Sequence, residues 1–264
     1  MLKVLKIELT DRCNANCIFC ETKKAKGGLM PLETFKNIVI EFPEVKEVQP
    51  QFFGEPLLHP QFIDALKFLK ENNKKVVFYT NGSLLKGDIA QKIASIAPDK
   101  IIFSIESDHK ELYESLRRGL KWETTLENIE FFQMIKRPET TTVVRMTITQ
   151  ENVHIIEKIS NFWKQRVDEV AKSPEVPKAR KVKGQYLPVT CSRPWEQLVV
   201  KWNGNIVLCC IDWHGDYVMG HINDGIRNVW SGAKFEEMRK RINTGDLPEI
   251  CLQCGFKFTP VCNS

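Results

Sequence analysis

Along residues 2–173, short runs of β-branched and aromatic residues alternate with segments whose apolar residues recur every three or four positions. The helical spacing is clearest over residues 32–42, 62–69 and 124–136, and the first two segments follow a proline, which suits a first helical turn. Six strands are predicted, at residues 2–9, 44–52, 75–80, 100–106, 142–148 and 167–173. Strands separated by helical segments predict repeated βα units and therefore a parallel sheet.

The pattern changes after residue 173. Two apolar runs within residues 197–209 flank Asn203-Gly204, a pair that favours a type I′ hairpin in which both central residues have positive φ. A helix is expected from Ala233 to Asn243, ending near Gly245. Such a small unit gains stability from a bound metal, because its own core is small. We therefore expect three parts: a βα domain at residues 1–173, a linker rich in proline and lysine at 174–190, and a small hairpin-plus-helix domain at 191–264.

Cysteine is the residue type that points most clearly to chemistry. The 264-residue chain is 42% hydrophobic, which is enough for a large core, and it contains nine cysteines. No signal-like segment or apolar stretch of about 18 residues occurs, so we expect a soluble cytoplasmic protein with no membrane contact. In a reducing compartment, thiols serve as metal ligands or reactive groups more often than as disulfides. They form two sets, separated by residues 21–190: Cys13, Cys17 and Cys20, then Cys191, Cys209, Cys210, Cys251, Cys254 and Cys262.

The first set has the spacing C-x3-C-x2-C and directly follows the first predicted strand. A structural zinc site requires four ligands, so these three thiols fit it poorly unless a distant residue completes the site. A [4Fe–4S] cluster held by three thiolates leaves one iron free to bind a chelating small molecule. Polar residues also stand at the ends of later predicted strands, where the loops of a βα barrel converge on a functional site.

The triple-cysteine motif, with the aromatic Phe19 just before Cys20, resembles the signature of the radical S-adenosylmethionine (SAM) superfamily. The resemblance extends from residue 2 to about residue 173 and implies a partial (β/α)6 TIM-like barrel. It implies that SAM chelates the free iron and is cleaved to methionine and a 5′-deoxyadenosyl radical, which removes a hydrogen atom from the substrate. A flavodoxin or ferredoxin is implied as the electron donor.

The same resemblance assigns SAM contacts to residues at the ends of the predicted strands. The main chain of Gly54 and Glu55 is expected to bind the SAM amino group, although Phe53 stands where many members have glycine. Arg145 is expected to bind the carboxylate through its bidentate fork, with an ion pair inside the barrel as the structural alternative. The remaining expected contacts are Ser104 and Glu106 at the ribose, Phe19 at the adenine, and Asn81 in a Thr80-Asn81-Gly82 segment that also suits an ordinary turn.

Four cysteines of the second set, with Gly204 five residues before one of them, resemble the shortened SPASM domain called Twitch. Four thiolates close one auxiliary [4Fe–4S] cluster, so the resemblance implies two clusters in total. Zinc is the alternative, because ligand number and spacing suit both metals. Cys262 does not fall at the expected spacing, and a role as a mobile thiol or a substitute ligand stays open. The expected ligands are Cys191, Cys209, Cys251 and Cys254.

Cys210 follows Cys209 on the second strand of the expected hairpin, so its side chain is expected on the other face of that strand. The resemblance suggests that it donates hydrogen to the substrate, and the alternative is a buried inert thiol. Two further groups are interpreted as structural. We favour loop solvation over proton transfer for Asp212, His214 and Asp216, and a cation pair at a helix end over substrate contacts for Arg117 and Arg118.

The chain starts close to its first strand, without the leader-recognition domain of many peptide maturases, and its appendage is similar to that of aminocyclitol dehydrogenases. We therefore expect a small hydroxyl-bearing substrate, such as a sugar, aminocyclitol or aminoglycoside, that undergoes epimerisation or dehydrogenation. A peptide maturase with a separate leader-binding partner is the alternative enzyme. A non-catalytic zinc or iron–sulfur protein that binds a partner is the alternative from another class.

The charge distribution adds little to these alternatives. The net charge is +5, and the densest basic stretch, residues 177–185, is interpreted as part of a solvated linker, with a docking surface for an acidic protein as the alternative. Aromatic residues are not interleaved with basic ones in this stretch, so nucleic-acid binding is not expected.

Overall fold

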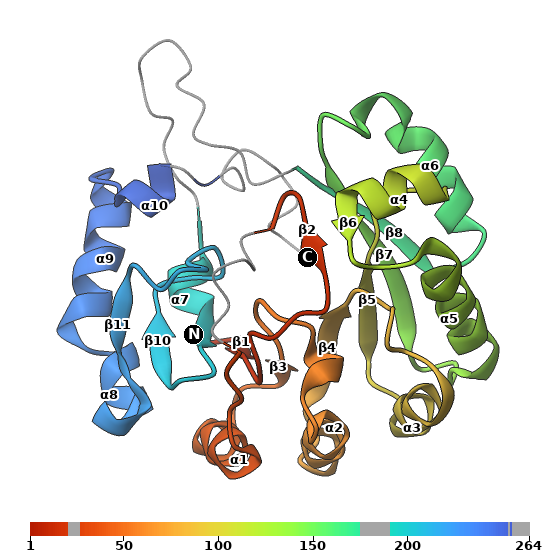
Figure 1. Ribbon diagram of the computed structural model, residues 1–264. Coiled ribbons are helices and arrows are strands. Elements are labelled where there is room, and N and C mark those ends of the chain that lie inside the picture. The colour runs from red at the N-terminus through yellow and green to blue at the C-terminus, as the bar shows by residue number, and fades with distance from the viewer. Residues whose placement is uncertain (21–26, 175–190, 253, 255–264) are drawn as a thin grey trace.

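A computed structural model describes residues 1–20, 27–174, 191–252 and 254, and its centre is a parallel sheet (Figure 1). All six strands predicted for the βα region are present and parallel to their neighbours. The second is much shorter than predicted, because Pro50 has no N–H to donate to a neighbouring strand. The six are β1 (Val4–Ile7), β3 (Glu47–Gln49), β4 (Lys75–Thr80), β5 (Lys100–Ser104), β7 (Thr141–Ile148) and β8 (Glu169–Pro174).

Helices cover the outer face of this sheet, below it and at its sides in Figure 1. The three segments with clear helical spacing form α1 (Leu32–Glu41), α2 (Phe62–Glu71) and α5 (Trp122–Ile135). Three further helices were not predicted, partly because small or polar residues such as Ala90, Ala94 and Ser160 occupy buried positions and weaken the apolar pattern. They are α3 (Gly87–Ile96), α4 (Lys110–Leu116) and α6 (Ile156–Lys164).

Alternate residues of each strand point to opposite faces of the sheet. Leu5 and Ile7 on β1, and Val144 and Met146 on β7, are fully buried in the core against the helices. The inner face carries a smaller apolar cluster of Val77, Ile102 and Val143. It follows that the residues between the core positions share this inner face, among them Lys6, Gln49, Tyr79, Arg145 and Ser173.

The C-terminal segment extends the same sheet. Its first strand, β9 (Gln197–Val200), pairs in parallel with β1, and β10 (Asn205–Val207) and β11 (Val218–His221) continue the sheet in antiparallel fashion. Four α-helices accompany them in the described residues: α7 (Arg193–Glu196), α8 (Ile226–Trp230), α9 (Ala233–Thr244) and α10 (Glu249–Leu252). The described strands follow the order β11-β10-β9-β1-β3-β4-β5-β7-β8, and the two end strands do not pair, so the sheet forms a partial barrel, as predicted.

The hairpin between β9 and β10 differs from the predicted type I′ turn. Gly204 has a φ of 86°, but Asn203 is not among the described non-glycine residues with positive φ, so the type I′ prediction is wrong. The amide of Gly204 donates to the carbonyl of Lys201 at 2.9 Å, and that of Lys201 donates to the carbonyl of Asn205 at 2.8 Å. This is a three-residue loop in which only the last position needs positive φ, and glycine supplies it.

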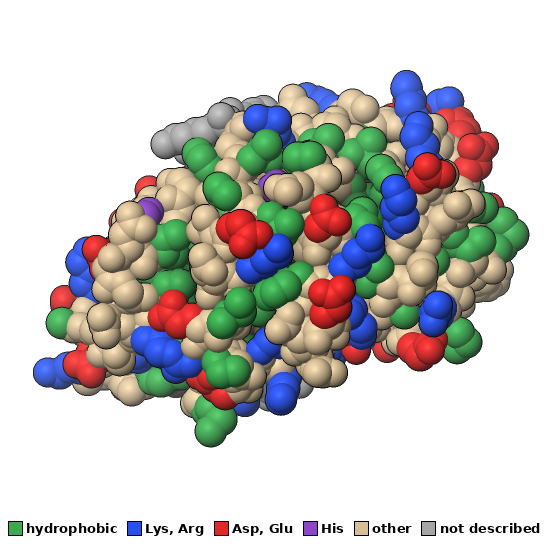
Figure 2. All heavy atoms as spheres, turned by 90° about the horizontal axis from the view of Figure 1, so that it is seen from below, with side chains coloured by type: hydrophobic (Ala, Val, Ile, Leu, Met, Phe, Trp, Pro, Cys, Tyr) green, Lys and Arg blue, Asp and Glu red, His purple; other side chains and the backbone are tan. Residues whose placement is uncertain are grey.

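The helical face seen from below carries acidic and basic side chains interspersed among apolar ones (Figure 2). In the part of the chain that the structure describes, no helix has both the length and the apolar character to cross a bilayer. Two features singled out from the sequence, the basic stretch at residues 177–185 and Cys262, lie outside the described residues.

Candidate active site

Cys13, Cys17 and Cys20 lie on the loop that follows β1, at the end of the sheet where the parallel strands terminate. Cys17 is buried, whereas the other two are half-buried. Burial raises the pKa of Cys13 to about 11 and also raises that of Cys17, and the nearby Cys20 adds to both effects. Burial therefore disfavours the thiolate form of Cys13 and Cys17, and a bound metal would offset that cost.

Two neighbouring loops hold this thiol loop in place. The Asp11 carboxylate accepts from the amide of Gly28 at 2.7 Å, and the amide of Glu55 donates to the carbonyl of Arg12 at 2.7 Å. A Cβ atom at Gly54 would lie 2.5 Å from the carbonyl oxygens of both Thr10 and Arg12. Glycine is therefore required at position 54 for the close approach of the two backbones.

Glu55 is buried and ties the end of β4 to the loop before α2. Its carboxylate accepts from the Thr80 hydroxyl at 2.8 Å, from the amide of Asn81 at 2.8 Å and from that of Leu57 at 3.2 Å. Burial raises the pKa of Glu55 to about 7 despite these bonds. Asn81 also donates to the Asn14 side chain of the thiol loop at 2.9 Å. Gly54, Glu55 and Asn81, all predicted site residues, thus adjoin the thiol loop.

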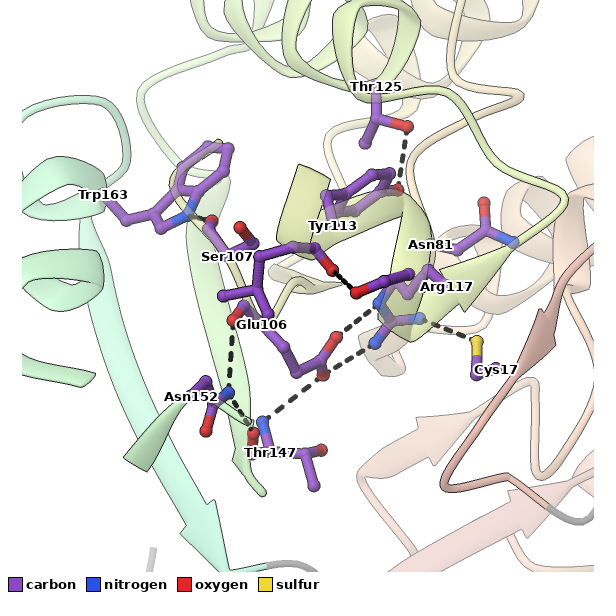
Figure 3. Close-up of polar contacts among 12 residues, drawn as sticks. Cys17, Asn81, Glu106, Ser107, Tyr113, Arg117, Thr125, Thr147, Asn152 and Trp163 are labelled. Carbon is purple, nitrogen blue, oxygen red and sulfur yellow. Dashed lines mark hydrogen bonds and ion pairs between the residues drawn. The ribbon is translucent and has the colours of Figure 1, made fainter. Parts of the chain in front are cut away.

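Glu106 and Arg117 form a buried, bidentate ion pair beside Cys17 (Figure 3). Arg117 donates to the two carboxylate oxygens at 2.5 and 2.8 Å, and its third nitrogen, Nη1, lies 3.7 Å from Sγ of Cys17. Burial disfavours the charge of Arg117, but Glu106 and Cys17 offset that cost and raise its pKa above the ordinary value. The Arg117 guanidinium also lies 5.4 Å from the ring centroid of Phe19.

Arg117 lies at the C-terminal end of α4, as predicted, but it is buried and does not form an exposed cation pair with Arg118. Arg117 begins β6 (Arg117–Arg118), which pairs antiparallel with β2 (Asn16–Cys17) of the thiol loop. Arg117 is 6% exposed, whereas Arg118 is exposed. The sequence offered one signal, two adjacent arginines, but nothing in it indicated that the first reaches a cysteine 100 positions away.

The other predicted SAM contacts lie on the strands themselves. Ser104 ends β5 and is the register partner of Arg145 on β7. Arg145 donates to the Ser173 hydroxyl at 2.6 Å and to the Tyr79 hydroxyl at 2.8 Å. Arg145 thus lies with residues of the inner face, whereas Glu106 and Phe19 lie with Arg117 at the thiol loop.

The second thiol set draws on two segments far apart in the sequence. Cys209 is buried, and burial together with the nearby Cys210, Cys251 and Cys254 raises its pKa. Cys251 lies on α10, and the amide of Cys254 donates to the carbonyl of Cys251 at 3.4 Å. Cys191 is half-buried. Among the described residues, no group of three or more His, Cys, Asp or Glu side chains is arranged to hold a single metal ion.

Cys209 and Cys210 follow β10 rather than lie on it, because the strand ends at Val207. The expectation that they alternate across a strand is therefore wrong. Both lie in a turn, and the Cys210 thiol contacts Nη1 of Arg193.

Asp212 is not a solvated loop residue either. It is 2% exposed and accepts from the amides of Asp216 and Tyr217 at 2.9 and 3.0 Å, so it holds the loop after the cysteine pair in shape.

Comparison with protein families identifies the chain. Residues 7–162 match the model of the radical SAM superfamily, which covers more than half of the sequence. This chain belongs to the radical SAM superfamily. Residues 191–255 match the SPASM model, described as an iron–sulfur cluster-binding domain. The resemblance inferred from the three cysteines and from the second thiol set is confirmed.

Two curated relatives show how far the similarity extends. The chain is 24% identical over 170 residues to the tungsten-containing aldehyde ferredoxin oxidoreductase cofactor-modifying protein of Pyrococcus furiosus, covering 61% of this chain and 48% of that protein. It is 25% identical over 169 residues to the AdoMet-dependent heme synthase of Methanosarcina barkeri, covering 62% of this chain and 47% of the synthase. The chain thus spans about half the length of these relatives.

Solved structures share the fold at low sequence identity. BtrN, solved in complex with AdoMet and 2-DOIA, superposes with a TM-score of 0.63 and 18% identity, covering 97% of this chain and 93% of BtrN. Streptococcus suis SuiB, solved with S-adenosylmethionine bound, superposes with a TM-score of 0.73 and 13% identity, covering 90% of this chain and 68% of SuiB. This similarity establishes the radical SAM fold.

Family membership implies SAM and a [4Fe–4S] cluster in this radical SAM enzyme, and the described residues fit both groups. The first thiol loop offers three soft ligands, which suit iron–sulfur clusters, and within the loop's described residues it has no fourth thiol that would close the set. Arg117 adds a buried cation beside Cys17, where an anionic group of a cosubstrate can be held.

Proposed function

We propose that this radical SAM enzyme abstracts hydrogen from a C–H bond of a small hydroxyl-bearing molecule, such as a sugar, aminocyclitol or aminoglycoside. One observation carries the proposal. Cys13, Cys17 and Cys20 lie on one loop, and the buried guanidinium of Arg117, which Glu106 occupies only in part, lies beside that loop. When bound, the cluster supplies the electron that splits SAM into methionine and the 5′-deoxyadenosyl radical.

The residues around the thiol loop have distinct roles in holding SAM. The backbone at Gly54 and Glu55 is proposed to bind the amino group, because it packs directly against the thiol loop. Glu106 and Ser104 are proposed to face the ribose, and Phe19 and Asn81 to line the adenine side. Glu106 is itself held by Arg117 and by the amide of Thr147 at 3.3 Å, which fixes its orientation.

Two cations are candidates for the SAM carboxylate. Arg145 was expected from the sequence, but Arg117 is supported by its contact with Cys17, since a carboxylate that chelates the free iron lies next to the cluster ligands. Arg117 uses two donors for Glu106, and a guanidinium has five, so donors remain for a second carboxylate. We assign the SAM carboxylate to Arg117.

The second thiol set is proposed to hold one auxiliary [4Fe–4S] cluster through Cys191, Cys209, Cys251 and Cys254. A flavodoxin or ferredoxin is the proposed electron donor. Cys210, next to one ligand but in contact with Arg193, is proposed as a thiol on the substrate side. In epimerisation its S–H would give a hydrogen atom to the opposite face of the substrate carbon, and the thiyl radical left on Cys210 would regain an electron from the electron donor and a proton from solvent. In dehydrogenation the substrate radical would instead lose one electron to the auxiliary cluster and one proton to solvent.

Anaerobic reconstitution followed by product analysis tests this proposal. We expect about eight irons per chain, and methionine with 5′-deoxyadenosine from SAM under reduction. Zinc alone, or no SAM cleavage by iron-loaded protein, would favour a non-catalytic partner-binding protein. With substrate in deuterium oxide, deuterium at carbon indicates epimerisation by a thiol, and a ketone indicates dehydrogenation. Modification of a peptide but of no small molecule would favour a peptide maturase.

A further inference from the structure

The inner face of the sheet carries cations that the proposed binding of SAM does not use. Lys6 on β1 and Arg145 on β7 both approach Tyr79 on β4: Nζ of Lys6 lies 5.7 Å, and the Arg145 guanidinium 5.9 Å, from the centroid of the tyrosine ring. β3 separates β1 from β4, and β5 separates β4 from β7. The curvature of the sheet therefore brings residues from three non-adjacent strands to one place.

Among the described residues, no carboxylate is paired with the two cations Lys6 and Arg145. Burial lowers the pKa of Lys6, and the nearby Arg193 and Arg145 add to this effect, whereas Cys210 and Glu47 act in the opposite direction. Glu47 is already engaged, because it pairs with Lys75 at 3.0 Å and accepts from Gln49 at 2.8 Å.

Lys74 shows what a structural lysine looks like in the same protein. Its ammonium donates to the carbonyls of Phe42, Pro43 and Val45 at 2.9, 3.1 and 2.6 Å, so all three of its protons are used. In the described part of the chain, Lys6 has no comparable set of acceptors, and its ammonium instead lies over a tyrosine ring. Arg145 donates only to two neutral acceptors, the hydroxyls of Ser173 and Tyr79. Like charges held together in a half-buried place, with no carboxylate of the described residues paired to them, indicate a site for an external anion.

Two glutamines add acceptors at the same inner face. Gln49 is the register partner of Lys6, and Gln197 is the register partner of Val4. The side-chain oxygen of each glutamine is buried and has no hydrogen-bond partner in the structure. Buried acceptors are normally paired, so these oxygens suit hydroxyl or amine donors of a ligand.

The group lies between the two thiol sites. Lys6 lies near both Cys210 and Arg193, and Arg193 contacts the Cys210 thiol. On the other side, Arg145 is two residues before Thr147, whose amide donates to Glu106. A ligand held here would therefore lie between the thiol loop with its SAM contacts and Cys210.

We propose that the substrate carries an oxyanion group, a phosphate or a carboxylate, which Lys6 and Arg145 bind at the inner face of the sheet. This inference rests on the proposed function and narrows it. Gln49 and Gln197 accept from hydroxyl or amine groups of the same molecule. A sugar phosphate or a sugar acid fits this site, whereas the ammonium groups of an aminoglycoside would meet cations.

Calorimetric titration of the reconstituted protein at low ionic strength, with SAM saturating, tests the site. The probes are inorganic phosphate and succinate, which separate a phosphorylated substrate from a carboxylate one. We expect wild-type protein to bind at least one probe, and Lys6→Met and Arg145→Met each to weaken that binding at least about tenfold. Lys6→Arg, which keeps the charge, should retain binding.

Lys67→Met is the matched control, because it removes one positive charge from an exposed position on α2, on the outer face. Iron content per chain identifies any variant that fails to fold. Failure of the wild type to bind either probe, or equal affinity in Lys6→Met and wild type, overturns the inference. SAM cleavage is assayed separately. If the wild type cleaves SAM but binds neither anion, this inference fails and the proposed function stands. If it binds anions but does not cleave SAM, the proposed function fails.

Discussion

Nη1 of Arg117 lies 3.7 Å from Sγ of Cys17, although 100 positions separate the two residues. Short antiparallel pairing of β2 with β6 brings them together, and Glu106 fixes the guanidinium from the opposite side. A buried cation is thereby placed against Cys17, a proposed ligand of the first cluster. We propose that Arg117 acts on both this cluster and SAM.

Substitution Arg117→Met is expected to weaken SAM binding about 10- to 100-fold, because a charged hydrogen-bond donor to the SAM carboxylate is lost. Loss of the cation should also make the potential of the first cluster more negative. Equilibrium binding and an EPR-monitored redox titration measure the two effects. The double variant with Glu106→Gln removes the carboxylate that would otherwise be left buried and unpaired.

Arg118→Met is the control for that variant, since Arg118 is the exposed neighbour on the same strand. Equal SAM affinity in the Arg117→Met and Arg118→Met proteins would indicate that Arg145, and not Arg117, binds the SAM carboxylate, as the sequence alone suggested.

Gly54→Ala is expected to prevent loading of the first cluster. The added methyl group would lie 2.5 Å from two carbonyl oxygens of the thiol loop, so the loop has to move. Iron should fall from about eight to about four per chain. Gly87→Ala is the control for backbone strain alone, because a Cβ there meets nothing within 4 Å although the residue has a positive φ of 51°. Full iron in Gly54→Ala would mean that the contact between the two loops is dispensable.

The adjacent residues Cys209 and Cys210 are expected to give opposite results. Cys209→Ala should lose the auxiliary cluster and about four irons, whereas Cys210→Ala should keep about eight irons and SAM cleavage. If the reaction is an epimerisation, Cys210→Ala should also lose deuterium incorporation from solvent. Iron analysis and mass spectrometry of the product measure these outcomes, and a loss of iron in both variants would make Cys210 a ligand.

Glu8 is expected to make the stability of the protein depend on pH. It is fully buried, and its carboxylate accepts from the amides of Phe53 and Trp202, each at 3.2 Å. Burial raises its pKa from 4.5 to about 7, so between these values the folded protein keeps a proton that the unfolded chain releases. Stability therefore falls as pH rises through this window, by at most about 1.4 kcal/mol per pH unit from this group.

Glu8→Gln removes this titration. The decrease in melting temperature between about pH 5 and about pH 7.5 should be smaller than in wild type by several degrees. An identical decrease in both proteins would show that Glu8 has the same pKa in the folded and unfolded states.

The sequence predicted those parts of the fold that have local patterns. Strand periodicity located all six strands of the barrel, and cysteine spacing pointed to the two domains that the family models match. The pairing of β9 with β1 was not predictable, because parallel pairing between distant strands leaves no local signal. The type I′ turn was expected from Asn203-Gly204, but the glycine alone takes positive φ in the longer loop.

In the candidate active site, the sequence could predict only those residues that belong to the family's motifs. Glu55 and Asn81 were expected near the thiol loop, and their hydrogen bonds place them there. Arg117, Lys6 and Tyr79 were missed because their importance lies in partners from distant strands. A charged residue on a strand or at a helix end has too many ordinary explanations for the sequence alone to single it out.

The most direct test of the whole account is the reductive cleavage of SAM by reconstituted protein in wild type and in Cys17→Ala. We expect the wild type to release methionine and 5′-deoxyadenosine, and Cys17→Ala to release neither while retaining the irons of the auxiliary cluster, about four per chain. Undiminished cleavage in Cys17→Ala, or no cleavage by wild type loaded with both clusters, would contradict the account.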